Sequence, residues 1–255
     1  MKMINLLCLR MFNPVIPSES IEDRHNYLLR ELSKIDPPLG LDGIDTKDLK
    51  MPSTEKDIVH VIYKHPETKG VSQIYWYDHR TPTIRWEEDT YSFGIDRILY
   101  EFKPNYKKIS FQDIIYSNFP QVIEIIKPRV AENYYSRYSI CYEYGHTPNE
   151  PTPVDKHGLP ISPVPAYNNL EARGITPNGR NNIYTLSPAC YWDNDLCQTA
   201  LGYGRDEVIR RLTGRVPDVR PLADGVYIIF NDNPLLSFDD FLAIQHTFKP
   251  ILGLQ

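Results

Sequence analysis

The chain has 255 residues, of which 41% are hydrophobic and 24% are charged, and its formal net charge is −5. A chain of this length can bury a sizeable core. The acidic balance argues against nucleic acid as a direct ligand, because phosphate binding needs a clustered basic surface. A basic protein partner fits the charge better. The 18 tyrosines can either line strands or enrich a binding surface, since Tyr can be half-buried and still form a hydrogen bond.

The amino-terminal sequence MKMINLLCLRMF contains an apolar run from Met3 to Leu9 that Arg10 interrupts. No small-residue cleavage site follows it, and no run in the chain approaches the ~20 apolar residues of a membrane span. We therefore expect a cytoplasmic protein, rather than a periplasmic one, that does not contact a membrane. The four cysteines form no C-x-x-C pair, which predicts reduced, structural thiols.

The first half of the chain predicts both strands and helices. Residues 3–12 carry apolar side chains on both faces and predict a strand internal to a sheet. The sequence SESIEDRHNYLLRELSKIDPP predicts a helix capped by Ser20, and apolar residues predict a second helix from Ser53 towards His65. Three strand-like runs, VSQIYWYDH, TIRWEE and YSFGIDRILYEF, then predict an antiparallel meander.

The middle of the chain predicts a helix, a strand and an irregular segment. In SFQDIIYSNFPQVIEIIKP, Ser110 and Asp113 form a capping pattern, and Pro120 must kink or split the helix. Alternating tyrosines predict a strand over 134–144. Residues 145–181 hold seven prolines without apolar periodicity and predict an excursion within one folded unit.

The carboxy-terminal part is the best organised. NNIYTLSPACYW predicts a strand, and GRDEVIRRLTG predicts a short helix that Gly214 stops. A strand over 226–230 leads to a helix capped by Ser237 and Asp240 and closed by Gly253. Strands and helices occur in separate runs, so we expect an α+β fold of one domain, residues 1–255, with helices packed on a mainly antiparallel or mixed sheet.

The sequence shows no catalytic pattern. It has no G-x-S-x-G motif, and its seven histidines are scattered; His60 and His65 lack the intervening Glu of zinc proteases. The loop GYGRDE lacks the P-loop lysine and the third glycine of a dinucleotide-binding loop, so it predicts a helix entry turn. We therefore assign no catalytic, cofactor-binding or metal-binding residue.

Two segments combine aromatic and acidic residues, WEED and YWDND. Such carboxylates can belong to a solvated turn, act as a general acid and base or hold a divalent cation, or flank an aromatic anchor that grips a basic protein. The last use gives the predicted partner-binding residues: Trp86, Glu87, Glu88, Asp89, Tyr191, Trp192, Asp193 and Asp195.

The end of the chain, RRLTG followed by VRPLADGVYIIFNDNPLLSFDDFLAIQHTFKPIL, resembles that of immunity proteins paired with bacterial type VI secretion effectors. LLRELSKIDPPL and SFQDIIYSNFPQVIEIIKP are similar to helices of the immunity protein 52 family. The Pro-rich residues 145–181 depart from that pattern. The resemblance implies a toxin inhibitor of bacterial competition, not an enzyme, that occludes or distorts the active site of a cognate effector. The alternatives are an effector adaptor or chaperone, and an enzyme of unrecognised type using dispersed carboxylates and histidines.

Overall fold

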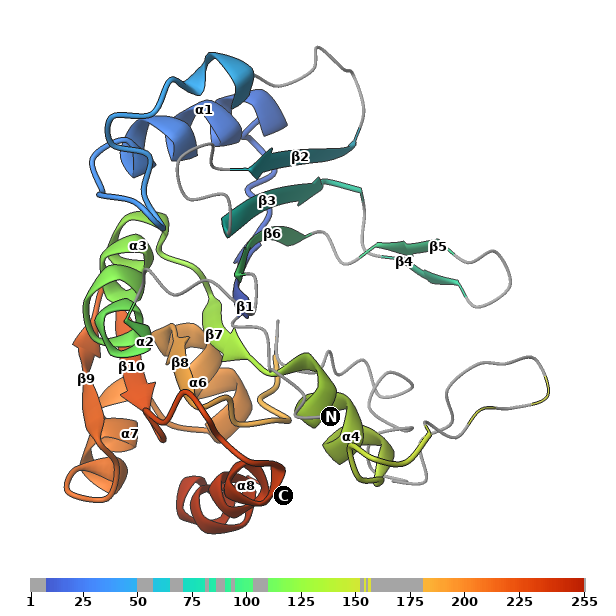
Figure 1. Ribbon diagram of the computed structural model, residues 1–255, viewed down its shortest axis with the longest axis vertical. Helices are drawn as coiled ribbons and strands as arrows, with labels where there is room; N and C mark the ends of the chain where they lie inside the picture. Colours follow the sequence, from blue (N-terminus) through green and yellow to red (C-terminus); the bar gives the residue numbers. More distant parts are fainter. Residues whose placement is uncertain are drawn as a thin grey trace. The chain divides into compact units, whose positions relative to one another are not determined.

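The computed structural model describes residues 8–49, 57–64, 71–80, 83–85, 90–92, 95–102, 110–151, 154, 156 and 181–254. They fall into two compact units, an N-terminal unit of Cys8–Ala131 and a C-terminal unit from Glu132 on. Each unit combines helices with antiparallel strands, so the predicted α+β class is confirmed (Figure 1). That the two units make one domain stays a prediction.

The N-terminal unit is built on the strand order β2-β3-β6-β1, in which each neighbouring pair is antiparallel. Strands β4 and β5 pair separately with each other, so the predicted meander is interrupted. The elements are β1 (Cys8–Pro14), α1 (Ile21–Leu32), the 3-10 helix η1 (Thr46–Leu49), β2 (Ile58–Lys64), β3 (Val71–Asp78), β4 (Thr83–Arg85), β5 (Thr90–Ser92), β6 (Ile95–Phe102), α2 (Phe111–Asp113), the π-helix η2 (Ile114–Asn118) and α3 (Phe119–Ile126).

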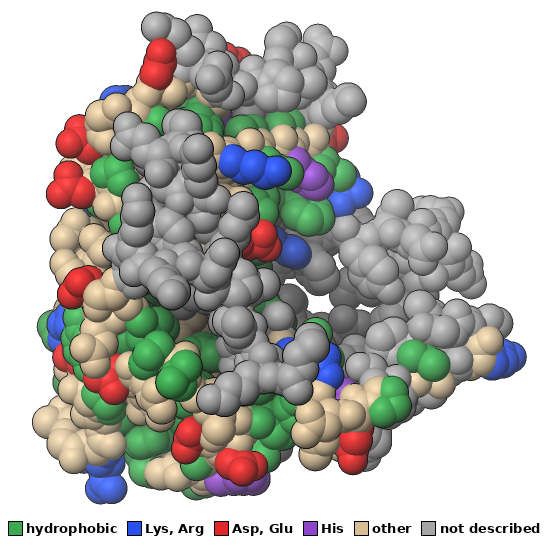
Figure 2. All heavy atoms as spheres, viewed as in Figure 1, with side chains coloured by type: hydrophobic (Ala, Val, Ile, Leu, Met, Phe, Trp, Pro, Cys, Tyr) green, Lys and Arg blue, Asp and Glu red, His purple; other side chains and the backbone are tan. Residues whose placement is uncertain are grey.

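The two faces of the N-terminal sheet differ in chemistry because side chains alternate along each strand. Helix α1 packs on one face, where the His25 ring lies against Tyr75 and Tyr77. On the other face the strand register aligns one residue from each strand into a row, His60, Trp76, Arg97 and Phe12. Figure 2 shows His and Lys or Arg side chains beside hydrophobic ones over β2 and β3. The inner face therefore holds the core, and the outer face carries an aromatic and cationic row.

The predicted helix from Ser53 towards His65 is wrong. Residues 58–64 form β2, in which Val59, Val61 and Tyr63 are buried and the residues between them are not. Ile58, Val59, Ile62 and Tyr63 also fit helical spacing, but their β-branched and aromatic side chains favour a strand when a neighbouring strand is available. Pairing with β3 decides between the two patterns.

The helix at 110–126 is confirmed, including its cap and its interruption. The Ser110 hydroxyl accepts a hydrogen bond from the Asp113 N–H at 3.2 Å. Pro120 has no N–H to donate into the preceding turn, and the turn before it is a π-helix in which the Phe119 N–H donates to the Ile114 carbonyl. The wider turn of η2 thus accommodates Pro120 within the helical segment.

The C-terminal unit has the strand order β7-β8-β10-β9, in which β10 is antiparallel to both β8 and β9. Its last helix has the predicted capping box of Ser237 with Asp240, and Gly253 ends it with φ 76°. The elements are β7 (Val130–Tyr134), which leads in from the N-terminal unit, α4 (Ser136–Tyr144), β8 (Ala189–Trp192), α6 (Asn194–Leu201), α7 (Arg205–Leu212), β9 (Asp218–Leu222), β10 (Gly225–Ile229) and α8 (Phe238–Leu252).

The predicted strand at 134–144 is also wrong, because β7 ends at Tyr134 and a helix follows. Tyr138 and Cys141, almost one helical turn apart, are both buried. The Tyr138 ring lies 5.7 Å from the Phe241 ring of α8, and its hydroxyl donates to the Leu236 carbonyl. Packing against α8 therefore outweighs the alternating tyrosines. The expected Pro-rich excursion lies mostly outside the described residues.

Close packing explains one glycine of the strand pair β8–β10. A Cβ atom on Gly225 would lie 2.0 Å from the Trp192 carbonyl oxygen, so no other residue fits there.

All four cysteines are free, as predicted, and burial raises the pKa of Cys197 to about 12. Among the described residues, no helix is both long and apolar enough to cross a membrane.

Candidate partner-binding site

The predicted contact residues do not form one surface. Trp86, Glu87, Glu88 and Asp89 lie outside the described residues. Tyr191 and Trp192 belong to β8 and are 0% and 2% exposed, so the expectation that they anchor a partner from a surface loop is corrected. Burial on both sides of β8 takes them into the core.

The two carboxylates that follow them lie at the start of α6. Asp193 caps this helix, because its Oδ1 accepts a hydrogen bond from the Leu196 N–H. Asp195, in the first turn, is exposed and makes no hydrogen bond or ion pair with any described residue. A carboxylate at the start of a helix is stabilised by the helix dipole and needs no other partner.

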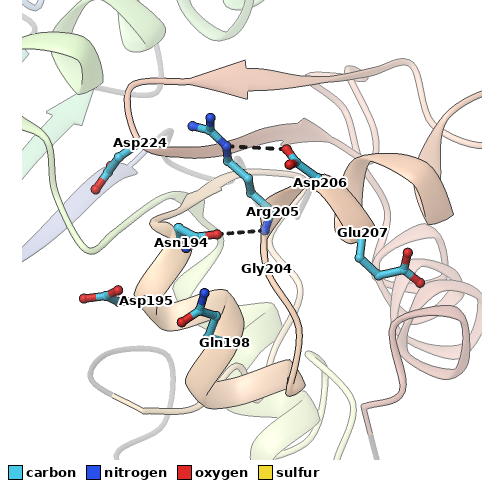
Figure 3. A pocket seen from close by; sticks show the side chains of 8 residues that line it. All are labelled: Asn194, Asp195, Gln198, Gly204, Arg205, Asp206, Glu207 and Asp224. Atoms are coloured by element: carbon cyan, nitrogen blue, oxygen red, sulfur yellow. Dashed lines mark hydrogen bonds and ion pairs between the residues drawn. The ribbon is translucent and has the colours of Figure 1, made fainter.

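Asp195 lines a hollow of about 680 Å³ in the C-terminal unit, which we call the acidic hollow. Figure 3 shows its wall: the start of α6 faces the start of α7, and Asp224 adds a carboxylate from the turn between β9 and β10. The lining residues are Asn194, Asp195, Gln198, Gly204, Arg205, Asp206, Glu207 and Asp224.

One side-chain contact joins the two helix starts. The Asn194 Oδ1 accepts a hydrogen bond from the Arg205 N–H at 3.0 Å, and a Cβ atom on Gly204 would lie 2.8 Å from that oxygen. Gly204 therefore lets the two helix ends approach. The loop 202–207 is a helix entry turn, as predicted, with Gly204 as the N-cap of α7. Its first N–H is already bonded to Asn194, which leaves less of the helix end to hold a phosphate.

The four carboxylates of the hollow differ in how far they are neutralised. Glu207 accepts hydrogen bonds from Arg210 and Arg211, which lower its pKa to about 2. The 93%-exposed Asp206 lies 3.6 Å from the Arg205 guanidinium.

Asp224 accepts a hydrogen bond from the Tyr191 hydroxyl at 2.6 Å. Burial, and after it this hydrogen bond, raises the pKa of Tyr191. Among the described residues Asp195 and Asp224 form no ion pair, and Asp206 pairs with the Arg205 guanidinium. The hollow is therefore suited to a lysine or arginine side chain.

The described residues give less support to the metal-binding and catalytic alternatives than to partner binding. Among the described residues no group of three His, Cys, Asp or Glu side chains is placed to hold a metal ion. The Cys141 Sγ lies 3.9 Å from the His146 Nε2, but burial raises the pKa of the thiol, which is the opposite of activation. The residues that could serve the enzyme alternative are Glu87, Asp89, His146, His157 and Asp193, and three of them, Glu87, Asp89 and His157, lie outside the described residues.

Comparison with known proteins does not identify a function for this site. No protein-family model matches the sequence, so the resemblance to the immunity protein 52 family has no support from that comparison. No curated protein matches it either. A similar solved structure is the Pseudomonas aeruginosa T6SS protein PA0821, at 12% identity and a TM-score of 0.49, covering 96% of this chain and 73% of that chain. T6SS denotes the type VI secretion system. A likeness at this level carries no conclusion about function.

Sequence reasoning found only Asp195 of the lining residues. GYGRDE predicts a helix entry turn and no binding site, and nothing in the segment LADG marks Asp224. Carboxylates in the first turns of two successive helices were the available signal. The sequence does not predict that these two turns converge, because their convergence depends on the contact between Asn194 and Arg205.

Proposed function

We propose that this protein is an immunity protein that binds a cognate type VI effector and neutralises it by occluding or distorting the effector's active site. The acidic hollow is the docking site in this proposal, and a basic segment of the toxin is its occupant. The proposal assigns no catalytic residue to this chain and locates the complex in the cytoplasm.

The observation that carries the proposal is the set of exposed carboxylates around the hollow. Asp195 and Asp206 occupy the same position, the second residue of their helices. Helix stability accounts for both locations, and the convergence of the two helix starts gathers them into one acidic surface. Such a surface attracts a basic partner over a distance and fixes its orientation.

The test is a binding titration with the effector encoded beside this gene. Calorimetry should give a complex whose affinity falls as salt rises, because exposed charges are screened. The double variant Asp195→Arg with Asp206→Arg should weaken binding at least tenfold. Asp239→Arg is the matched control, since Asp239 is the exposed second residue of α8; it should change the affinity less than twofold.

Three outcomes would count against the proposal. An equal effect of the double variant and of Asp239→Arg on the affinity would show that the hollow is not part of the binding interface. If the neighbouring reading frame encoded no secreted effector, the proposal would have no cognate partner. Binding that leaves the toxin fully active would contradict neutralisation and favour an adaptor.

A further inference from the structure

The N-terminal unit contains a polar cluster at one end of its inner sheet face. Asn13 of β1 and Asp96 of β6 are paired in the strand register, and they are 4% and 3% exposed. The Asp96 Oδ1 lies 3.1 Å from the His79 Nε2, and its Oδ2 lies 3.9 Å from the Arg24 Nε of α1. Asp96 is thus held between two side chains, whereas the hydrogen bonds of its neighbour Asn13 go to backbone carbonyls.

Asn13 uses only half of its hydrogen-bonding capacity. Its Nδ2 donates to the carbonyls of Ile126 and Lys127, at 3.3 and 3.5 Å, which fixes the orientation of the amide. Its buried Oδ1 has no hydrogen-bond partner among the described residues. An amide oxygen accepts up to two hydrogen bonds, and leaving one buried without a donor costs free energy. Such a group needs an explanation.

The backbone that Asn13 holds is itself strained. Lys127 ends α3 in the left-handed region, at φ 48° and ψ 58°, although it is not glycine. The turn of η2, one turn before α3, is a π-helix. Strained residues and π-turns both occur preferentially near binding sites.

Asn13 and Lys127 line a hollow of about 340 Å³, which we call the Asn13 hollow. This volume lies at the lower end of small-molecule sites. The hollow also offers the Glu19 carboxylate, the Arg24 guanidinium and the Tyr27 side chain, and its apolar wall includes Ile16 and Ile125. All of these residues belong to the N-terminal unit.

The charges around the hollow balance. Arg24 is matched by Asp96, and the Glu19 carboxylate offsets Lys127 in the lining. An anion or a cation would meet a like charge, so a neutral ligand fits better. The lining offers acceptors in Asn13 and Glu19 and donors in Arg24, Tyr27 and Lys127. A primary carboxamide is a neutral group that meets both needs, because its N–H groups can donate to the Asn13 Oδ1 and its carbonyl can accept from the donors.

We propose that the Asn13 hollow binds a small molecule with a primary carboxamide on a branched aliphatic body, whose N–H donates to the Asn13 Oδ1. The aliphatic body packs on Ile16 and Ile125. The Asn13 Oδ1 is closed to water in this structure, so the proposal requires that a side chain of the rim change rotamer before the ligand reaches it. The site is independent of the acidic hollow, which lies in the other unit.

The test is a ¹⁵N NMR titration of the full chain with isobutyramide, isobutyrate and isobutylamine. The Asn13 side-chain amide is assigned from its loss in Asn13→Leu. Isobutyramide should move that resonance and the Lys127 backbone amide saturably, in the millimolar range. The acid and the amine should bind at least tenfold more weakly.

Two exposed isoleucines of the same unit provide matched variants. Ile16→Ala removes part of the wall and should weaken isobutyramide binding about threefold, whereas Ile62→Ala on β2 should leave it unchanged. The absence of a saturable shift at Asn13 would overturn the proposal. Equal binding of all three probes, or equal effects of the two alanine variants, would overturn it as well.

Discussion

Each unit of the protein buries side-chain amides, and two of them, one from each unit, are paired to different degrees. Gln245 of α8 and Asn13 of β1 are 1% and 4% exposed. Gln245 donates to the Leu186 carbonyl at 2.7 Å and accepts from the Leu186 N–H at 2.8 Å. Asn13 donates to two carbonyls and accepts from no described residue. Both hydrogen-bonding groups of Gln245 are paired, which is typical of a structural role, whereas the unpaired acceptor of Asn13 is the basis of the proposed carboxamide site.

The largest expected effect on stability follows from removing the two hydrogen bonds between Gln245 and the Leu186 backbone. Gln245→Met keeps the length of the side chain but leaves the N–H and C=O of the fully buried Leu186 without partners. Two such groups cost about 4 kcal/mol of the free energy of unfolding. Urea unfolding and hydrogen exchange of the Leu186 amide measure the loss. Gln198→Met, on the exposed side of α6, is the control and should change stability by less than about 0.5 kcal/mol.

The next effect concerns the buried cation of the same helix. Lys249 is 5% exposed, and its Nζ lies 2.9 Å from the Tyr142 hydroxyl and 4.7 Å from the Tyr184 ring centroid. Burial lowers the pKa of Lys249 to about 8. In the N-terminal unit the buried Arg24 instead lies beside a carboxylate.

This lowered pKa makes stability depend on pH. Below pH 8 the folded protein holds a proton on a buried amine, which opposes folding by up to about 3 kcal/mol. Between pH 8 and the usual pKa the unfolded chain binds more protons than the folded one, so stability rises with pH. Lys249→Met should therefore stabilise the protein at pH 7, and its advantage should shrink by pH 9.5. Urea titrations at pH 7, 8, 9 and 9.5 check this; a constant advantage would contradict it.

A smaller effect is expected at the other amide. Asn13→Leu removes two long hydrogen bonds, but it also removes the acceptor that has no donor, so stability should fall by less than about 1 kcal/mol. The measurement is urea unfolding of the variant beside Gln245→Met. A loss as large as that of Gln245→Met would mean that the Asn13 oxygen is satisfied, and the contrast between the two amides would fail.

The smallest effect is expected at the acidic hollow. Asp195→Asn and Asp206→Asn remove exposed carboxylates from first helical turns, where the helix dipole contributes about 0.5 kcal/mol. Thermal unfolding should thus change little, while affinity for a basic partner falls. A loss above about 2 kcal/mol would show that the carboxylates serve the fold instead.

Much of this fold could be predicted from local signals. Ser20, Ser110 and Ser237 each cap a helix as their spacing to Asp23, Asp113 and Asp240 predicts. These interactions span three residues and do not depend on the rest of the chain. Two of the errors, at 58–64 and 134–144, concern segments whose apolar residues fit both a helix and a strand. In each, a distant partner decides, β3 for the first and α8 for the second.

The sites were less predictable because both depend on convergence. Asp195, Asp206 and Asp224 come from three elements, and the open acceptor of Asn13 is visible only once α3 lies beside β1. The pattern YWDND was informative in part: its aromatic residues complete the core, and its second carboxylate reaches the hollow.

The most direct test of the central claim is growth rescue in cells that express the neighbouring effector. Wild-type protein and Asp239→Arg should restore growth, and the double variant Asp195→Arg with Asp206→Arg should not, at equal protein levels. Rescue by all three would contradict docking through the acidic hollow, and rescue by none would contradict the immunity function itself.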